Sequence, residues 1–427
     1  MNEHVIHRAI DAVWRIESAR IIATVARMVR EVGLAEELAQ DALVAALERW
    51  PKTGIPANPG AWLTTVAKHG AIDHLRRRKL LERKHEEIGR ELEIDVDAAA
   101  SFADAMSEDD DIDDDLLRLL FVACHPVLSP EARIALTLRL LGGLSTAEIA
   151  RAFLVPEPTV AQRIVRAKRT LAEARVPFEV PRAEGRAERL ESVLAVLYLI
   201  FNEGYTATAG SEWMRPALCE EALRLGRIAA ELAPQEPEVH GLVALMEIQA
   251  SRLRARVGPN GEPVLLLDQD RARWDYLLIG RGLAALKRAE TLIGASGPGS
   301  YALQAAIAAC HAQARIADDT DWRRIAMLYA LLTQVAPSPV VELNRAVAVG
   351  MAYGPEAGLA IADTLAGCGT LDKVYLLPCV RADLLAKLGR LEEARQEFER
   401  AAALTNNASE RKLMQDRARD IVVKNER

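Results

Sequence analysis

The sequence predicts an all-α protein made of several helical domains, and three observations lead to this prediction. The 25 Gly and 19 Pro make up about 10 % of the 427 residues, against a usual share of roughly 12 %. Few residues therefore interrupt the long stretches of Ala, Leu, Arg and Glu, which favour helix. Apolar residues recur at helical spacing along most of the chain. The length exceeds the roughly 100 to 200 residues of one domain, so two to four domains are expected.

Residues 1–90 form the first predicted domain. Apolar residues at helical spacing predict two helices before Trp50-Pro51, where the second helix is expected to end. Residues 51–59, with their Pro and Gly, are expected to form a loop, and a third helix should run from about residue 60 to 79. The end of this helix carries the basic cluster 76–79. That cluster either interacts favourably with the helix dipole or contributes to nucleic-acid binding.

Residues 91–117 contain 12 Asp or Glu and no Lys or Arg. A run of this kind repels itself and buries no apolar surface, so an extended linker is expected. The linker explains the overall charge of −7, because residues 1–90 carry +3, residues 118–185 carry +4 and residues 186–427 carry −2. The acidity is therefore local, and it does not exclude nucleic acid as a partner of the flanking domains.

Residues 118–182 are predicted to form a second domain around a helix-turn-helix. Ser145 and Glu148 have the spacing of a capping box. Helices are expected over residues 116–124, 130–141, 146–153 and 158–174. On the last of them, one face is apolar, with Val160, Ile164, Ala167 and Leu171. The opposite face offers Thr159, Gln162, Arg163, Arg166 and Arg169, whose donors suit phosphates and base edges. A structural helical hairpin with a solvated Arg face is the alternative interpretation.

Four motifs stand in order along residues 5–178: LAEELAQDAL (34–43), AWL with AIDHLRR (61–63 and 71–77), LSTAEIA (144–150), and PTV with RAK (158–160 and 166–168). Together they resemble the extracytoplasmic-function sigma factors of bacteria. The resemblance implies that residues 1–90 are sigma region two, which binds the polymerase clamp and melts the minus-ten element. It implies that residues 118–182 are sigma region four, which reads the minus-thirty-five element. Core RNA polymerase and promoter DNA are the implied partners.

The resemblance also implies roles for individual residues. The clamp-binding residues would be Glu37, Gln40, Asp41 and Glu48. The minus-ten element would be contacted by residues 51–59, including Asn58, and by His69, Asp73, Arg76 and Arg77. The minus-thirty-five element would be contacted by Thr159, Gln162, Arg163, Arg166 and Arg169, with Lys168 nearer the phosphates. His69 stands where many members have Asn, so it either contacts a flipped base or is a partly buried side chain. Trp62 is either a core anchor or a stacking platform, and the apolar residues beside it favour the core.

The linker acquires a second interpretation from the resemblance. In this family the segment between the two domains threads through polymerase channels that later hold nucleic acid. Residues 108–115 are therefore either a solvated spacer or a mimic of nucleic-acid charge.

The C-terminal half is an addition that an ordinary two-domain sigma factor lacks. Residues 183–297 are expected to be a helical middle segment without a clean repeat, similar to that of sigma factors with such extensions. Residues 298–427 show a tetratricopeptide-like pattern, most clearly from Leu384 to Ala402, with Gly389 at the turn. Stacked helix pairs of this kind either bind a protein or peptide on a concave surface or form a rigid scaffold. The extension is expected either to control the factor in place of a separate anti-sigma protein or to dock it on polymerase.

Several functions are not expected. The motifs of phosphate-binding loops, zinc proteases and serine hydrolases are missing from the sequence, so we expect no enzyme, no catalytic residue, no metal site and no cofactor. Five scattered Cys are expected to be reduced, mostly buried thiols. The start of the chain does not resemble a secretory signal and no apolar run approaches a membrane span, so a cytoplasmic protein is expected. The alternative function is a helical adaptor or regulator that is not a polymerase subunit.

Overall fold

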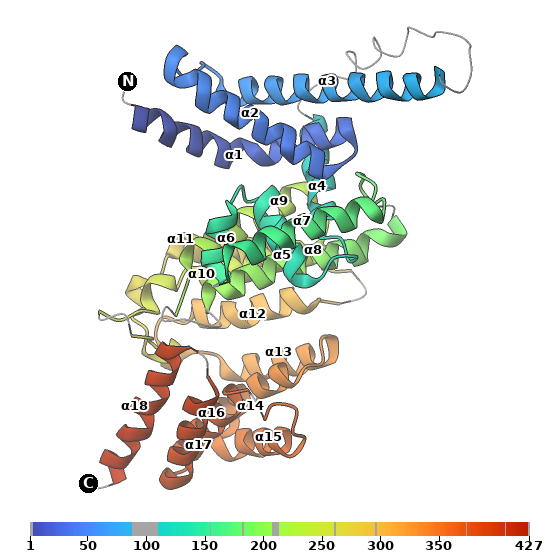
Figure 1. Ribbon diagram of the computed structural model, residues 1–427. Coiled ribbons are helices and arrows are strands. Elements are labelled where there is room, and N and C mark those ends of the chain that lie inside the picture. Colours follow the sequence, from blue (N-terminus) through green and yellow to red (C-terminus); the bar gives the residue numbers. More distant parts are fainter. Residues whose placement is uncertain are drawn as a thin grey trace. The chain divides into compact units, whose positions relative to one another are not determined.

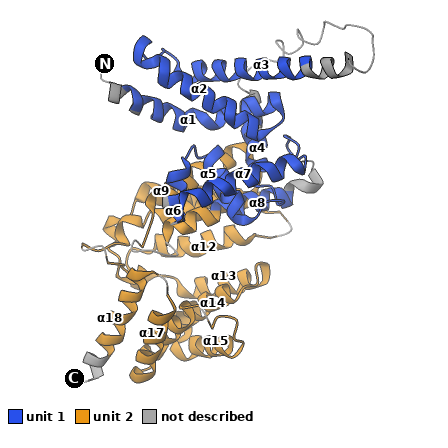
Figure 2. Ribbon diagram, in the orientation of Figure 1, with its two compact units in different colours: residues 1–197 blue, residues 198–427 orange. Residues whose placement is uncertain are grey.

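The computed structural model describes residues 3–87, 110–153, 155–181, 183–206, 213–259, 262–294, 297–372, 374–405 and 407–425. These residues form helices and no β-strand, apart from one isolated antiparallel bridge between Val257 and Pro263 (Figure 1). The all-α prediction is confirmed. The chain divides into two compact units, residues 1–197 and residues 198–427 (Figure 2). None of the described helices combines the length and the low charge that a bilayer crossing requires.

Three long helices begin the first unit. They are α1 (Glu3–Val29), α2 (Val32–Thr53) and α3 (Pro59–Glu87), and each contacts the other two. The predicted break at Trp50-Pro51 was wrong by three residues, because Pro51 is tolerated in the last turn of α2 and Gly54 closes the helix by donating its N–H to the Trp50 carbonyl. The predicted end of α3 was also wrong. This helix continues to Glu87, so the basic cluster 76–79 lies within it and does not cap its C-terminus.

Five further helices complete the first unit. They are α4 (Asp110–Ala123), α5 (Pro130–Leu140), α6 (Thr146–Phe153), α7 (Glu157–Glu173) and the first part of α8 (Ala183–Tyr205). The capping box is confirmed, since Ser145 N–H donates to Glu148 Oε2 at 2.8 Å and Glu148 N–H donates to Ser145 Oγ at 3.2 Å. The apolar face of α7 is also confirmed, because all four of its predicted residues are buried.

The predicted extended linker was wrong for its last part. Helix α4 begins at Asp110, and Asp115, Leu116 and Leu117 are buried rather than solvated. Asp115 can be buried because two arginines neutralise it: Arg27 Nε lies 3.1 Å from its Oδ2, and Arg118 Nη1 lies 2.6 Å from its Oδ1. The remaining linker residues, 91–109, lie outside the described part of the chain.

The second unit contains the end of α8 and a succession of helices that each contact the next. These are α9 (Pro216–Leu232), α10 (Pro237–Ala250), α11 (Tyr276–Leu292), α12 (Ser300–Gln313), α13 (Trp322–Val335), α14 (Pro339–Tyr353), α15 (Pro355–Gly367), α16 (Leu376–Lys387), α17 (Leu391–Leu404) and α18 (Ala408–Asn425). The prediction that residues 186–292 are helical throughout was wrong between α10 and α11. The described residues of that connection form the short 3₁₀ turns η1 (Leu253–Ala255), η2 (Leu266–Asp268) and η3 (Arg271–Arg273) and the isolated bridge.

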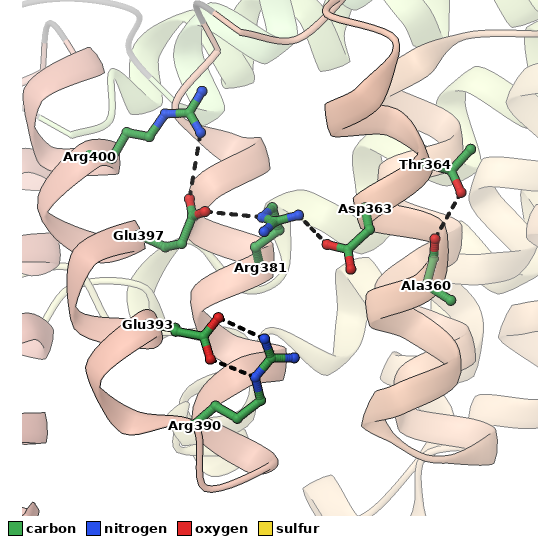
Figure 3. A network of polar contacts seen from close by, with 8 residues as sticks. All are labelled: Ala360, Asp363, Thr364, Arg381, Arg390, Glu393, Glu397 and Arg400. Carbon is green, nitrogen blue, oxygen red and sulfur yellow. Dashed lines mark hydrogen bonds and ion pairs between the residues drawn. The ribbon is translucent and has the colours of Figure 1, made fainter.

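The core of the second unit is a chain of small clusters. One joins α10 and α11 to α12, and so crosses the predicted boundary at residue 297. The next joins α12, α13 and α14, and the last extends from α14 to α18. Polar contacts connect the final helices: Arg381 of α16 pairs with Asp363 of α15, and its Nε lies 3.1 Å from Glu397 Oε1 of α17 (Figure 3).

Two glycines allow α14 and α15 to cross closely. A Cβ on Gly358 would lie 2.5 Å from the Ala346 carbonyl oxygen and 2.8 Å from the Gly350 Cα. Both atoms belong to backbone, so they cannot move aside as a flexible side chain would. We expect Gly358→Ala to lower the free energy of unfolding by about 1–3 kcal/mol, measured by urea denaturation.

The matched control is Gly367→Ala, on the same helix, where an added Cβ would meet no atom within 4 Å. This variant should be unchanged or more stable, because Ala favours helix over Gly by up to about 1 kcal/mol. Equal stability of the two variants would show that α14 and α15 can accommodate a methyl group at Gly358, so that their close approach does not require glycine there.

Candidate nucleic-acid interface

Helix α7 presents one polar surface to solvent. Four of the residues predicted to contact DNA are exposed on it, Thr159, Gln162, Arg166 and Arg169, whereas Arg163 is half-buried. Arg169 Nε lies 2.6 Å from Glu173 Oε1, but both side chains are well exposed, so this pair is weak and leaves the guanidinium available. The surface combines a hydroxyl, an amide and guanidinium groups, which are the donors that base edges and phosphates accept.

The sequence interpretation missed Val165, which lies on the same surface of α7 with 64 % of its area exposed. An apolar side chain among exposed polar ones can contact the methyl group of thymine in a major groove. The signal was present in the sequence, because Val165 falls outside the buried stripe of α7. We define the α7 surface as Thr159, Gln162, Val165, Arg166 and Arg169.

Lys168 is directed away from the α7 surface. Its ammonium group pairs with Glu36 of α2, although the side chain was predicted to lie near DNA phosphates. Glu36 is only 2 % exposed and also accepts from Arg139 Nε of α5 at 2.7 Å and from Gln40 Nε2 at 2.6 Å. Sequence reasoning missed Glu36 and Arg139. The only signal was an acidic residue next to the buried small residues Ala35 and Ala39 of α2.

Further ion pairs join α1 to the helices after the linker. Arg15 of α1 lies 2.7 Å from Glu148 of α6, and the Asp115 cluster connects α1 to α4. Gly143, with φ +65°, approaches α1 so closely that a Cβ there would lie 2.9 Å from Ser18 Oγ. The three helices before the linker and the four after it therefore contact one another within the first unit.

The residues predicted to contact the minus-ten element lie just before α3 and along its middle. Asn58 caps this helix, since its Oδ1 accepts from the Ala61 N–H at 3.0 Å. Exposed side chains then follow one another along α3: His69, Asp73, Arg76 and Arg77. The alternative of a partly buried His69 was wrong. Trp62 is half-buried and lies edge-to-face against the buried Trp50, with ring centroids 5.4 Å apart, which supports its interpretation as a core anchor.

The α2 surface consists of Glu37, Asp41, Val44 and Glu48, which are all exposed and follow helical spacing. Three of these are predicted polymerase-binding residues. Gln40, the fourth, is instead bonded to Glu36 and half-buried. Val44 was not predicted, and its 51 % exposure gives this acidic surface an apolar centre.

No three His, Cys, Asp or Glu side chains gather as a metal site within the described residues. The five cysteines are free thiols, and burial raises the pKa of Cys124 and of Cys219 to about 12. Both groups therefore stay protonated and unreactive near neutral pH.

Two protein-family models match the segments of the chain before and after the acidic linker. Residues 15–80 match the model of sigma-70 region 2, and residues 118–171 match the model of sigma-70 region 4. This chain therefore contains the two sigma-70 domains, region 2 and region 4. Sigma-70 domains are those of non-enzymatic transcription factors, and they imply binding to core RNA polymerase and promoter DNA. Residues 189–290 match a family of unknown function, DUF6596.

Two relatives show how far this similarity extends. An uncharacterized protein of Rhizobium meliloti (strain 1021) is 46 % identical over 384 residues, which cover 90 % of this chain and 89 % of the relative. A Mycobacterium tuberculosis protein named "Probable ECF RNA polymerase sigma factor SigI" is 29 % identical over 183 residues. The match covers 60 % of that protein and 42 % of this chain.

Proposed function

We propose that this protein is a sigma factor of the extracytoplasmic-function type, which binds core RNA polymerase in the cytoplasm and directs promoter recognition, promoter melting and transcription initiation. The presence of both sigma-70 domains in one chain, in the order region 2 and then region 4, carries the proposal. The exposed donors of the α7 surface support a role in reading the minus-thirty-five element, with α6 and α7 as the proposed helix-turn-helix.

The other two surfaces have proposed roles in the same complex. The α2 surface would bind the polymerase clamp through its carboxylates and Val44. The loop before α3 and the exposed His69, Asp73, Arg76 and Arg77 would contact the minus-ten element. His69 is exposed enough to stack on, or hydrogen-bond to, an extruded base.

We propose that the contact between Glu36 and Lys168 opens when the factor binds a promoter. The two promoter elements lie about 25 base pairs apart, which at about 3.4 Å per base pair is roughly 85 Å. Glu36 and Lys168 are in direct contact, and α3, the longest helix described here, extends only about 44 Å at 1.5 Å per residue. Regions 2 and 4 cannot reach both elements of straight DNA while that contact persists.

We propose that the acidic linker mimics nucleic-acid charge. Because Asp115 is buried, it is not among the residues that the experiment changes. Neutralising residues 108–111 to the corresponding amides should weaken holoenzyme assembly, because four negative charges facing basic channel walls are lost. Asp115 is left unchanged, since its loss would leave Arg27 and Arg118 without a buried counter-charge. Assembly is measured by titrating core polymerase. Unchanged affinity would leave the linker as a spacer.

We propose that the C-terminal half regulates the factor through tetratricopeptide-like helix pairs. The residues that carry the repeat pattern, Ala346, Ala382, Ala394 and Phe398, are buried, which fits helix pairs stacked through small residues and one aromatic. The proposed ligand of the repeat surface is a protein or peptide. A rigid scaffold remains the alternative.

Run-off transcription with core polymerase and the DNA upstream of this protein's own gene tests the proposed function. The full chain should yield a promoter-specific transcript that core polymerase alone does not. The truncated comparison should end after Thr206 rather than Gly185, because Ser192 of α8 donates to the Cys124 carbonyl at 2.6 Å and accepts from Arg133 at 2.6 Å. Equal transcription by the truncated chain would exclude regulation by the C-terminal half. No transcript, with no co-purification of polymerase, would favour the adaptor.

A further inference from the structure

Three arginines are buried in the second unit, and no described Asp or Glu lies within ion-pair distance of them. Arg252, Arg256 and Arg271 are 7 %, 5 % and 8 % exposed, and none forms an ion pair with a described carboxylate. Buried charges in proteins are normally paired, as Glu247 is with Arg227 in the same unit. Each of the three guanidinium groups also has one fully buried nitrogen that forms no hydrogen bond to a described residue. The cluster therefore holds an excess of positive charge and free donors.

Aromatic rings hold these arginines in position without neutralising them. The guanidinium of Arg256 lies 3.5 Å from the ring centroid of Tyr205, and that of Arg271 lies 4.6 Å from the ring centroid of Trp274. Arg252 lies 5.9 Å from both of these rings and donates to the side-chain oxygen of Gln249. Cation–π contacts stabilise a guanidinium but leave its charge available to an anion.

Arg252 lines a cavity of about 260 Å³ whose wall includes residues of α8, α10, α12, α13 and α14. Among the described residues of its wall there is no Asp or Glu. Besides Arg252 and three tyrosines, its polar residues are Asn202, Gln249, Gln304 and Asn344, which carry carboxamides, and His311, which carries an imidazole. Burial, with Arg252 and Arg271 nearby, lowers the pKa of His311 to about 4, so its ring is neutral near pH 7. The buried Nδ1 of His311 has no partner among the described residues.

The rest of the wall is apolar or aromatic, with Phe201, Leu245 and Ile307 as examples. The volume is slightly below the roughly 300–1,000 Å³ of sites for drug-sized ligands. The cavity therefore suits a compact molecule that has one anionic group and an apolar body. Helices α8, α10 and the turn with Arg252 belong to the segment of unknown function, whereas α12, α13 and α14 follow that segment.

We propose that this cavity binds a small organic anion, with a carboxylate or phosphate group paired to Arg252 and an apolar or aromatic body against the opposite wall. The guanidinium supplies the charge that an anion requires, and the carboxamides and His311 supply hydrogen bonds that fix its orientation. The proposal concerns binding by the second unit, and it stands whether or not that unit regulates transcription.

Calorimetric titration of the full-length protein tests the site with three probes: 4-hydroxybenzoate, acetate and inorganic phosphate. We expect at least one to bind and to raise the melting temperature, because a ligand that binds only the folded state stabilises it. Binding of 4-hydroxybenzoate alone would show that the apolar wall contributes, and binding of phosphate or acetate would show that charge suffices. Sodium chloride at matched ionic strength is the control. No binding by any probe, or an equal shift with chloride, would overturn the proposal.

The variant Gln249→Glu gives the sharper test, because it places a carboxylate on the residue to which Arg252 already donates. This internal anion should compete with the ligand and weaken probe binding by about ten-fold or more, while the melting temperature is unchanged or higher. Gln235→Glu adds the same charge at an exposed position between α9 and α10 and should bind the probes as the wild type does.

A second variant, Arg252→Met, separates binding from folding. Replacing an unpaired buried cation by an apolar side chain of similar length should leave the protein as stable as the wild type or more stable, with probe binding lost. A stability loss in this variant, together with wild-type affinity in Gln249→Glu, would make Arg252 a purely structural residue and would overturn the proposal.

Discussion

Replacing Arg166 with alanine is expected to lower transcription from the cognate promoter by about ten-fold to a hundred-fold. A guanidinium that contacts a base edge contributes roughly 1–3 kcal/mol of discrimination, and the Arg166 side chain is exposed on the α7 surface. Gln162→Ala should have an effect of the same order. Run-off transcription by the reconstituted holoenzyme gives the measurement, at a salt concentration kept constant because phosphate contacts are salt-dependent.

The matched control is Arg281→Ala, which removes one exposed arginine from α11 in the second unit and changes the net charge by the same amount. It should transcribe as the wild type does. The pattern across promoter variants is also informative, because Arg166→Ala should tolerate base changes at one position that the wild type rejects. Wild-type transcription by the Arg166 and Gln162 variants would exclude the α7 surface as the reader of the minus-thirty-five element.

Replacing Glu36 with glutamine is expected to have two opposite effects. The free energy of unfolding should fall, because Arg139 and Lys168 lose their shared carboxylate. Removing one partner of a fully buried pair costs about 3–5 kcal/mol, and the loss here should lie below that range because the two cations are 23 % and 20 % exposed. The affinity of the free protein for DNA should rise, because Lys168 becomes available to a phosphate.

Denaturant unfolding and salt-dependent DNA binding measure these two effects. One additional phosphate contact should steepen the dependence of log affinity on log salt by about 0.9. Glu37→Gln is the control, since it removes the same charge from the neighbouring exposed residue of α2. If Glu36→Gln and Glu37→Gln have equal stability and equal DNA affinity, the contact between α2 and α7 does not restrain the factor.

The sequence predicted the parts of the candidate interface that depend on one helix at a time. The apolar stripe of α7 determines which of its side chains face outward, so Thr159, Gln162 and Arg166 were identified before the structure. Helix ends were less predictable. Glu87 rather than Lys79 ends α3, because no breaker residue follows the basic cluster and helical propensity continues past it.

The residues that sequence reasoning missed have partners far away in the chain. Arg139 and Glu36 are 103 positions apart, and Asp115 was assigned to a solvated linker because Arg27 is not visible in its local sequence. The linker was predicted from its acidic composition alone. The burial of Asp115 depends on a cation that another helix, α1, supplies.

By itself, the sequence determined that this protein is all-α, that it carries the two sigma-70 domains in order, and where the capping box of Ser145 and Glu148 begins a helix. These features depend on residues within one or two turns, or on motif order. Only the tertiary structure decided that Lys168 pairs with Glu36, that Asp115 is buried, and that Arg252 lines a cavity in whose described wall no Asp or Glu stands. The physical reason is that the environment of a charge is set by the side chains that surround it in space, and these come from helices that the chain brings together only on folding.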